Sequence, residues 1–309
     1  MLPTKCFALA LAVLLSASAF AGTTPSPSFT TIDNPSDPTF NQLLGINDAG
    51  VIAGYFGSGA AGHPNQGYTI APPYTTFKAD IVPGSVQTQA TGINNNGVTV
   101  GFWTTTNTGT DADFGFIRLG KAPNFTYLNV NNPLVGSNPS VNQLQGINQS
   151  NIAVGFYNDA TNAPHGYSYS VKTGLYTPVN VPGAVSDIAV GISNDGMICG
   201  FFTNVAGRTE GFVKPQSGVS LTTFAVPGRA VTQWFGINDL GIVVGSYVGQ
   251  DTFPHGVIYN LATGKVTYID APNGIMGTVL NGINNKGEIV GFYTDAAGNV
   301  HGLLVTGAV

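Results

Sequence analysis

The chain has 309 residues, of which only 8% are charged, with 15 acidic against 10 basic side chains and a formal net charge of −5. Glycine contributes 42 residues, and a glycine-rich, charge-poor composition suits short strands and tight turns better than helices. Because no run of lysine or arginine is present that could follow a phosphate backbone, we expect no nucleic-acid partner.

Residues 1–21 have the organisation of a secretory signal peptide. Lys5 stands in a short polar start, a mostly apolar run follows and ends at Phe20, and the small residues Ala19 and Ala21 frame the predicted cleavage site. We expect cleavage after Ala21 and an extracellular or periplasmic mature protein. No later stretch has the roughly 18 apolar residues needed to cross a bilayer, so no membrane insertion is expected.

A single cysteine remains once this leader is removed. Cys199 stands where Ala53 and Val100 stand in other units of the repeat described below, so it is predicted to fill a slot in the core. One cysteine cannot form an internal disulfide. The chain also lacks a nucleophile elbow, a phosphate-binding loop and a dinucleotide fingerprint in the required contexts, and we expect no cofactor.

Residues 22–309 form one domain built from six copies of a single unit. The copies begin near residues 40, 87, 141, 186, 231 and 277. Each contains a glycine and an isoleucine followed by asparagine or serine. The six glycines are Gly45, Gly92, Gly146, Gly191, Gly236 and Gly282.

The first unit illustrates the four strands expected in every copy. A first strand ends at Ile46, and the turn 47–50 (NDAG) supplies residues that accept the positive φ of a tight hairpin. The second strand, 51–56, is apolar almost throughout, as expected where both faces are covered. A third strand opens on Gly67 after a variable polar loop. A fourth ends at Pro83, because proline lacks an amide hydrogen for the ladder.

The two ends of the repeat array complement one another. Residues 28–34, which precede Pro35, match the fourth strand of the other units, whereas the chain stops after the third strand of the last unit, which opens on Gly302. We therefore predict an all-β fold, a six-bladed β-propeller with four antiparallel strands per blade, in which this N-terminal closing strand completes the last blade. Closure removes the edges that an open array must protect.

The hairpin pattern GIN-x-x-G-x-[IV]-x-G, followed in three units by His-Gly, resembles the HAF-type extracellular repeat proteins of bacteria. The resemblance runs from about residue 28 to the end of the chain. This sequence has His-Gly where the family has His-Ala-Phe, and three units replace the histidine with Gln66, Phe114 and Glu210. The resemblance implies a secreted β-repeat protein and brings no established activity or catalytic residue.

One polar recurrence points to a binding site. A glutamine stands three residues before the repeat glycine in four units, at Gln42, Gln89, Gln143 and Gln233. If this strand is innermost in each blade, a partial ring of amides lines or rims the central channel, where it can bind sugar hydroxyls or ordered water. Hydrogen bonding between blades is the competing interpretation, and the favoured one.

Other polar side chains favour structural roles. His165, His255 and His301 share one repeat position, so sixfold symmetry would separate them around the ring, and each is expected to hold the loop before the third strand. Asp111 and Asp113 lie in the longest such loop and are weak candidates for a calcium site. Their calcium-loop pattern is incomplete, so a solvated loop is favoured and no metal is expected.

Three functions remain open. The first is a secreted, non-enzymatic binding module, expected to be a monomer, that presents loops to an unidentified macromolecule or carbohydrate. The second is a lectin-like, carbohydrate-binding propeller with sites repeated between blades. Repeated aromatic platforms would support it; the two tryptophans, Trp103 and Trp234, stand at different repeat positions, and the tyrosines that could substitute are Tyr55, Tyr157, Tyr247 and Tyr293. The third is a hydrolase or lyase at one channel mouth, drawing on the irregular segments 103–113 and 131–140 and on the pair Arg208 and Glu210.

Overall fold

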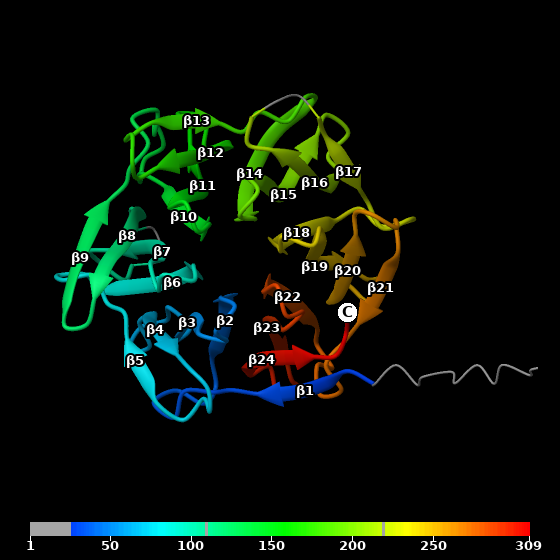
Figure 1. The fold of residues 1–309 in the computed structure, drawn as a ribbon, viewed down its shortest axis with the longest axis horizontal. Helices are drawn as coiled ribbons and strands as arrows, with labels where there is room; N and C mark the ends of the chain where they lie inside the picture. Colours follow the sequence, from blue (N-terminus) through cyan, green and yellow to red (C-terminus); the bar gives the residue numbers. More distant parts are fainter. Residues whose placement is uncertain (1–25, 109–110, 218–219) are drawn as a thin grey trace, which may run out of the picture.

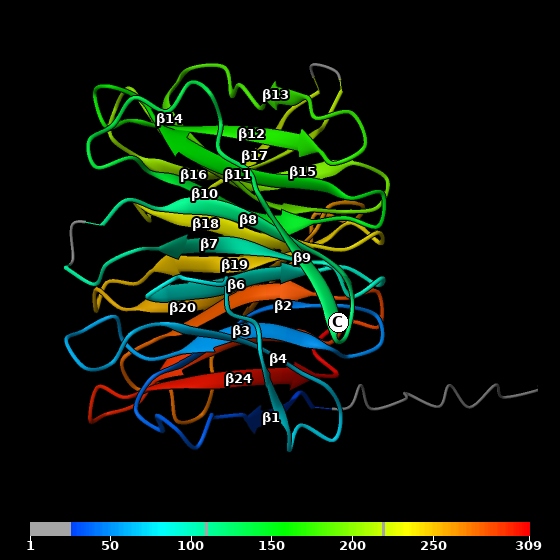
Figure 2. The same cartoon turned by 90° about the vertical axis from the view of Figure 1, so that its left-hand side faces the viewer.

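A computed structural model describes residues 26–108, 111–217 and 220–309. In these parts of the chain every regular element is a β-strand, and the strands form six four-stranded sheets arranged as blades around a central channel (Figure 1). The strands run between the two faces of the ring (Figure 2). The predicted six-bladed propeller is confirmed, whereas the expected signal peptide, 1–21, lies outside the described residues. Within the described ranges no helix is long and apolar enough to cross a membrane.

Five blades are built from consecutive strands, ordered from the channel outward, and the sixth takes its outermost strand from the N-terminus. Blades 1 and 2 contain β2 (Asn41–Ile46), β3 (Ile52–Phe56), β4 (Gln66–Ile70), β5 (Phe77–Ala79), β6 (Gln87–Ile93), β7 (Thr99–Thr104), β8 (Phe114–Lys121) and β9 (Asn124–Asn129). Blades 3 and 4 contain β10 (Asn142–Ile147), β11 (Ile152–Asn158), β12 (Pro164–Ser170), β13 (Tyr176–Pro178), β14 (Ala184–Ile192), β15 (Met197–Asn204), β16 (Thr209–Pro215) and β17 (Thr222–Phe224). Blades 5 and 6 contain β18 (Thr232–Ile237), β19 (Ile242–Val248), β20 (Pro254–Asn260), β21 (Val266–Ile269), β22 (Thr278–Ile283), β23 (Ile289–Thr294), β24 (Val300–Thr306) and β1 (Ser28–Thr31).

The innermost strand of every blade carries a β-bulge at the same place. In blade 1 the register between β2 and β3 shifts between Leu43 and Gly45, which leaves Leu44 as the extra residue. Gly54 of β3 allows the bulged strand to pack this closely, because a Cβ at Gly54 would lie 2.3 Å from the carbonyl oxygen of Gln42. A bulge re-aims its extra side chain. The bulged residues line the neck of the channel, and they are Leu44, Thr91, Gln145, Val190, Phe235 and Asn281.

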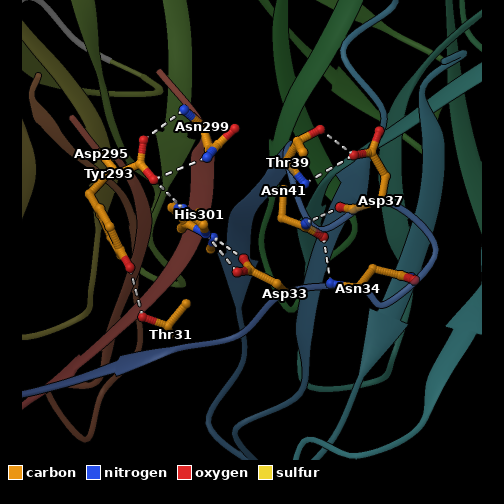
Figure 3. A network of polar contacts seen from close by, with 11 residues as sticks. Thr31, Asp33, Asn34, Asp37, Thr39, Asn41, Tyr293, Asp295, Asn299 and His301 are labelled. Carbon is orange, nitrogen blue, oxygen red and sulfur yellow. Dashed lines mark hydrogen bonds and ion pairs between the residues drawn. The ribbon is translucent and has the colours of Figure 1, made fainter. Parts of the chain in front are cut away.

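The ring closes through the N-terminal strand, as predicted. β1 pairs antiparallel with β24, with Ser28 opposite Thr306 and Thr31 opposite Leu303. Side chains reinforce this seam (Figure 3): the hydroxyls of Thr31 and Tyr293 lie 3.0 Å apart.

The residues after β1 also fasten the seam. The backbone amide of Asn34 donates to Oδ1 of Asn41 at 2.7 Å, and Nδ2 of Asn41 donates to the carbonyl of Asp37 at 2.7 Å. The N-terminal segment is therefore tied to blade 1 as well as to blade 6.

The apolar core is divided into clusters that each span the boundary between two blades. Leu43 of blade 1 packs with Val290 and Leu304 of blade 6, and all three side chains are buried. Cys199 of blade 4 is fully buried with Trp234 of blade 5, as expected for a core residue. Because every blade is covered on both sides by its neighbours, sheet-on-sheet packing continues around the whole ring.

Candidate functional site

The central channel has two mouths with different chemistry. The hairpin turns between the first and second strands surround one of them, which we call the turn mouth. The glutamines of the innermost strands surround the other, which we call the glutamine mouth. The repeat glycines lie at the neck, where a Cβ on Gly45 would meet the Cα of Gly92 at 2.9 Å.

At the turn mouth, the first turn residue of five blades is an asparagine whose side chain bonds to the next blade. Nδ2 of Asn47 donates to the carbonyl oxygen of Asn94 at 3.0 Å, and the same bond recurs from Asn94, Asn148, Asn238 and Asn284. Ser193 occupies this position in blade 4, where its shorter side chain bonds within its own turn. These asparagines are buried, so their hydrogen bonds fix neighbouring blades to one another.

The second turn residue closes another ring. The amide of Asp48 donates to Oδ1 of Asn95 at 2.8 Å, and the bond repeats around all six blades until the amide of Asn285 donates to Oδ1 of Asp48 at 2.8 Å. Burial opposes ionisation of Asp48, but hydrogen bonds from Asn285 and Asn95 outweigh it and lower the pKa of this carboxyl. The polar groups of the turn mouth thus bond to one another around the ring and hold neighbouring blades together.

The glutamine mouth contains a cavity of about 210 Å³. Gln42, Gln89 and Gln143 line it, whereas Gln233 does not. The bulged residues Leu44, Thr91, Gln145, Val190, Phe235 and Asn281 form its floor, and Phe102 joins its wall. Amides and apolar rings therefore meet in one hollow at the channel entrance.

The lining amides also bond to nearby residues. Oε1 of Gln42 accepts a hydrogen bond from Tyr55 Oη in its own blade at 2.9 Å. Nε2 of Gln89 donates to Oδ1 of Asn65 in blade 1 at 2.7 Å. Hydrogen bonds between blades, the competing interpretation, are therefore present, but both glutamines are half-exposed and retain free hydrogen-bonding capacity toward the cavity.

A second hollow of about 200 Å³ adjoins the first between blades 1 and 2. Gln89 and Phe102 line both cavities, and the second also contains Trp103. Nε1 of Trp103 donates to Oδ1 of Asn129 at 3.2 Å, and its ring lies 5.1 Å from that of Phe114. The two hollows therefore lie side by side between the channel entrance and Trp103, and together we call them the groove.

Asp111 and Asp113, the weak calcium candidates, both line this groove. Nε2 of Gln143 donates to Oδ2 of Asp113 at 2.5 Å, while Asp111 accepts from the amide of Thr108 at 3.0 Å. Burial raises the pKa of Asp113 and the charge of Asp111 adds to this effect, although the bond from Gln143 opposes it. Across 26–108, 111–217 and 220–309, no three His, Cys, Asp or Glu side chains gather closely enough to hold a metal ion.

The three repeated histidines lie in separate blades, each beside an aspartate of the preceding loop. Nε2 of His165 lies 2.9 Å from Oδ2 of Asp159, and Nε2 of His301 lies 3.2 Å from Oδ2 of Asp295. Each imidazole also packs against a tyrosine ring of the second strand. Their geometry is that of a loop support, as the shared repeat position suggested.

Sequence reasoning missed two of the five amide side chains that line the cavity at the glutamine mouth. Gln145 and Asn281 line the cavity two positions after the glutamine site, because side chains two residues apart share a face of a strand. That period was visible in the sequence, whereas the bulge that turns these residues into the channel was not. Nothing in the sequence placed Asn65 opposite Gln89, since they belong to different blades.

Comparison with known proteins supports the fold. No family model and no curated protein matches this sequence. AofleA from Arthrobotrys oligospora aligns with a TM-score of 0.57 at 11% identity, over 92% of this chain and 87% of that protein. A putative TolB from Agrobacterium tumefaciens aligns with a TM-score of 0.57 at 10% identity, over 90% of this chain and 96% of that one. At such identities the likeness shows a shared propeller fold.

Proposed function

We propose that this chain is a secreted, non-enzymatic binding module that binds a neutral carbohydrate chain in the groove between the glutamine mouth and Trp103. The observation that carries the proposal is that the two hollows adjoin and share Gln89 and Phe102 in their linings. A groove that alternates amide groups with aromatic faces suits sugars, because hydroxyls need hydrogen-bond partners and ring C–H faces stack on aromatic rings.

The groove favours one site per chain. Asn65 and Asp113, which face the glutamines of the next blade, hold a repeat position that carries proline, threonine or valine in the other four units. These hydrogen bonds between a glutamine and a polar side chain of the preceding blade are therefore confined to blades 1 to 3. We accordingly prefer a single extended site over equivalent sites between all blades.

The test is a glycan array followed by calorimetry on the whole protein with the best neutral oligosaccharide. Trp103→Ala and Gln89→Ala should each weaken binding about tenfold, through lost stacking and a lost hydrogen bond. Gln233→Ala is the matched control, since it removes the same side chain at the same repeat position outside the cavity. Equal losses from Gln233→Ala and Gln89→Ala would contradict the proposed site.

The same sugars test the enzymatic alternative. Asp113, with its raised pKa beside Asp111, has the protonation tendency of a general acid. If incubation with the bound oligosaccharide produces new reducing or unsaturated ends, and Asp113→Asn abolishes them, the groove is a hydrolase or lyase site. We expect the oligosaccharide to remain intact.

A further inference from the structure

Blade 3 holds a separate cavity, which shares no lining residue with either of the two hollows at the glutamine mouth. Its volume is about 370 Å³, larger than the cavity at the channel entrance. Tyr157, Tyr176 and the exposed side chain of Leu134 form apolar walls, while His165 and Asp187 supply polar groups. We call it the blade-three pocket.

Blades 5 and 6 show how the same place is filled elsewhere in the ring. In blade 6, Asp33 at the end of the fourth strand places Oδ2 2.7 Å from Nδ1 of His301 and accepts from the amide of Gly302 at 3.0 Å (Figure 3). In blade 5, Asp270 makes the same two contacts, at 2.8 Å to Nδ1 of His255 and 3.0 Å to the amide of Gly256. Each histidine is therefore held between two carboxylates.

Blade 3 lacks this carboxylate. Asn180 stands at the position of Asp33 and Asp270, and its φ of 44° gives it a backbone conformation that those aspartates do not adopt. Asp187 of the next blade accepts the hydrogen bond from the amide of Gly166 instead, at 2.7 Å. Among the described residues, His165 has a hydrogen-bonding partner only at Nε2, so its Nδ1 is left for a ligand.

Charged groups of both signs lie at the pocket or near it. Nζ of Lys214 lies outside the pocket lining and donates to the carbonyl of the lining residue Asn180 at 3.3 Å. Hydrogen bonds from Thr161 and His165 lower the pKa of Asp159, which stays ionised opposite Nε2 of His165. Burial raises the pKa of Asp187, although hydrogen bonds from the amides of Gly166 and Val181 oppose this effect.

We propose that the blade-three pocket binds a compact carboxylate on a ring, the chemistry of a uronic acid. The ligand carboxylate accepts a hydrogen bond from Nδ1 of His165, which is the histidine contact that Asp33 and Asp270 make in their blades, while Asp187 keeps the amide of Gly166. The ring lies against Tyr157 and Tyr176. Binding recreates in blade 3 the carboxylate–histidine–carboxylate arrangement of blade 6.

The test is titration of the whole protein with glucuronate, using glucose and glucosamine as matched neutral and cationic probes, followed by calorimetry and by NMR of ring-labelled histidine. Glucuronate should bind once per chain, more tightly than the other two, and should move the His165 ring resonances toward those of an imidazolium protonated on both nitrogens. His165→Phe should weaken glucuronate binding about tenfold or more, because a charge-assisted hydrogen bond is lost. The fold tolerates this pair of rings, since Phe114 stands beside Trp103 at the same repeat position.

Two sets of variants keep the proposal open to refutation. His255→Phe changes the equivalent residue of blade 5 and should leave glucuronate binding unchanged. Leu134 is 62% exposed at the pocket rim, so Leu134→Lys should strengthen binding and Leu134→Glu should weaken it, each by a few-fold. Equal binding of glucose, preference for glucosamine, no binding of glucuronate, or indifference to His165→Phe would each overturn the proposal. Trp103→Ala should not alter glucuronate affinity, which separates this site from the one at the glutamine mouth.

Discussion

The two mouths of the channel are built from the same six strands, yet one repeats almost perfectly and the other does not. At the turn mouth, Asp48 and its counterparts form an unbroken ring of hydrogen bonds. At the glutamine mouth, the corresponding positions carry glutamine, isoleucine or valine, and their partners change from blade to blade. The difference teaches that one end of each blade fixes the ring geometry, which leaves the other end free to diversify for binding.

The largest effect should come from opening the ring, which would disrupt both mouths. Deleting residues 26–35 removes β1 and Ile32, which is 5% exposed, and leaves the edge of β24 unpaired. We expect loss of cooperative thermal unfolding and association into oligomers, measured by circular dichroism and size-exclusion chromatography. A synthetic peptide of residues 26–35 added in trans should restore part of the transition. A truncated protein that melts like the full chain would contradict closure by β1.

The next largest effect should come from the turn mouth, where a substitution should lower stability and leave binding intact. Asn238→Ala removes the bond from Nδ2 to the carbonyl of Asn284 and the acceptor for the amides of Leu240 and Ile242, all about 3.0 Å long. We expect the free energy of unfolding to fall by about 2 to 3 kcal/mol in urea titrations, with sugar binding unchanged. Asn238→Ser is the control, because Ser193 fills this position naturally in blade 4, and it should cost clearly less.

A smaller effect should arise from pH at the histidine-bearing blades. Burial disfavours the imidazolium, but the hydrogen bonds that its ring donates to Asp33 and Asp295 prevail and raise the pKa of His301. A raised folded-state pKa stabilises the protein below the unfolded value of about 6.5, and the stabilisation is lost as pH rises through the folded pKa. The melting temperature should therefore be higher at pH 6 than at pH 8.5.

The control for this pH effect is the pair of variants His301→Phe and His255→Phe. The pKa of His255 is raised as well, since the hydrogen bonds that its ring donates to Asp270 and Asp251 outweigh the effect of burial. Combining the two replacements should flatten the pH dependence between 6 and 8.5. If the slope persists in the double variant, these histidines are not its source.

The smallest effect on stability should come from a substitution at the glutamine mouth. Gln89→Ala removes one half-exposed hydrogen bond to Asn65 and should change the free energy of unfolding by no more than about 0.5 kcal/mol. Chemical denaturation with a calorimetric binding assay would show a stable protein that has lost affinity. A large loss of stability would instead assign this amide to the structural frame.

Much of the fold was readable from the sequence because the repeat encodes it locally. The segment 28–34 looked like a fourth strand, and the structure pairs β1 with β24. The glutamine positions were also readable, since register follows from the distance to the repeat glycine. Contacts between blades were not, because Asn65 opposite Gln89 and Asp187 above Gly166 depend on how adjacent units meet.

The blade-three pocket illustrates the same limit. Alignment of the fourth strands would have shown asparagine at 180 where Asp33 and Asp270 stand. It would not have shown that Asp187 takes over the amide of Gly166, or that the backbone at Asn180 turns into the left-handed region. Whether a substitution in one repeat leaves a cavity depends on how the neighbouring residues and blades rearrange around it.

The pairing of β1 with β24 has a mechanical consequence. Because Ser28 lies opposite Thr306, both chain ends leave the sixth blade from the same end of an antiparallel pair. A force that pulls the two ends apart would load the ladder one rung at a time, as in a zipper, instead of shearing all its hydrogen bonds at once. The ring that resists heat through closure should thus yield to tension at its seam, with the peeling of β1 as the first event.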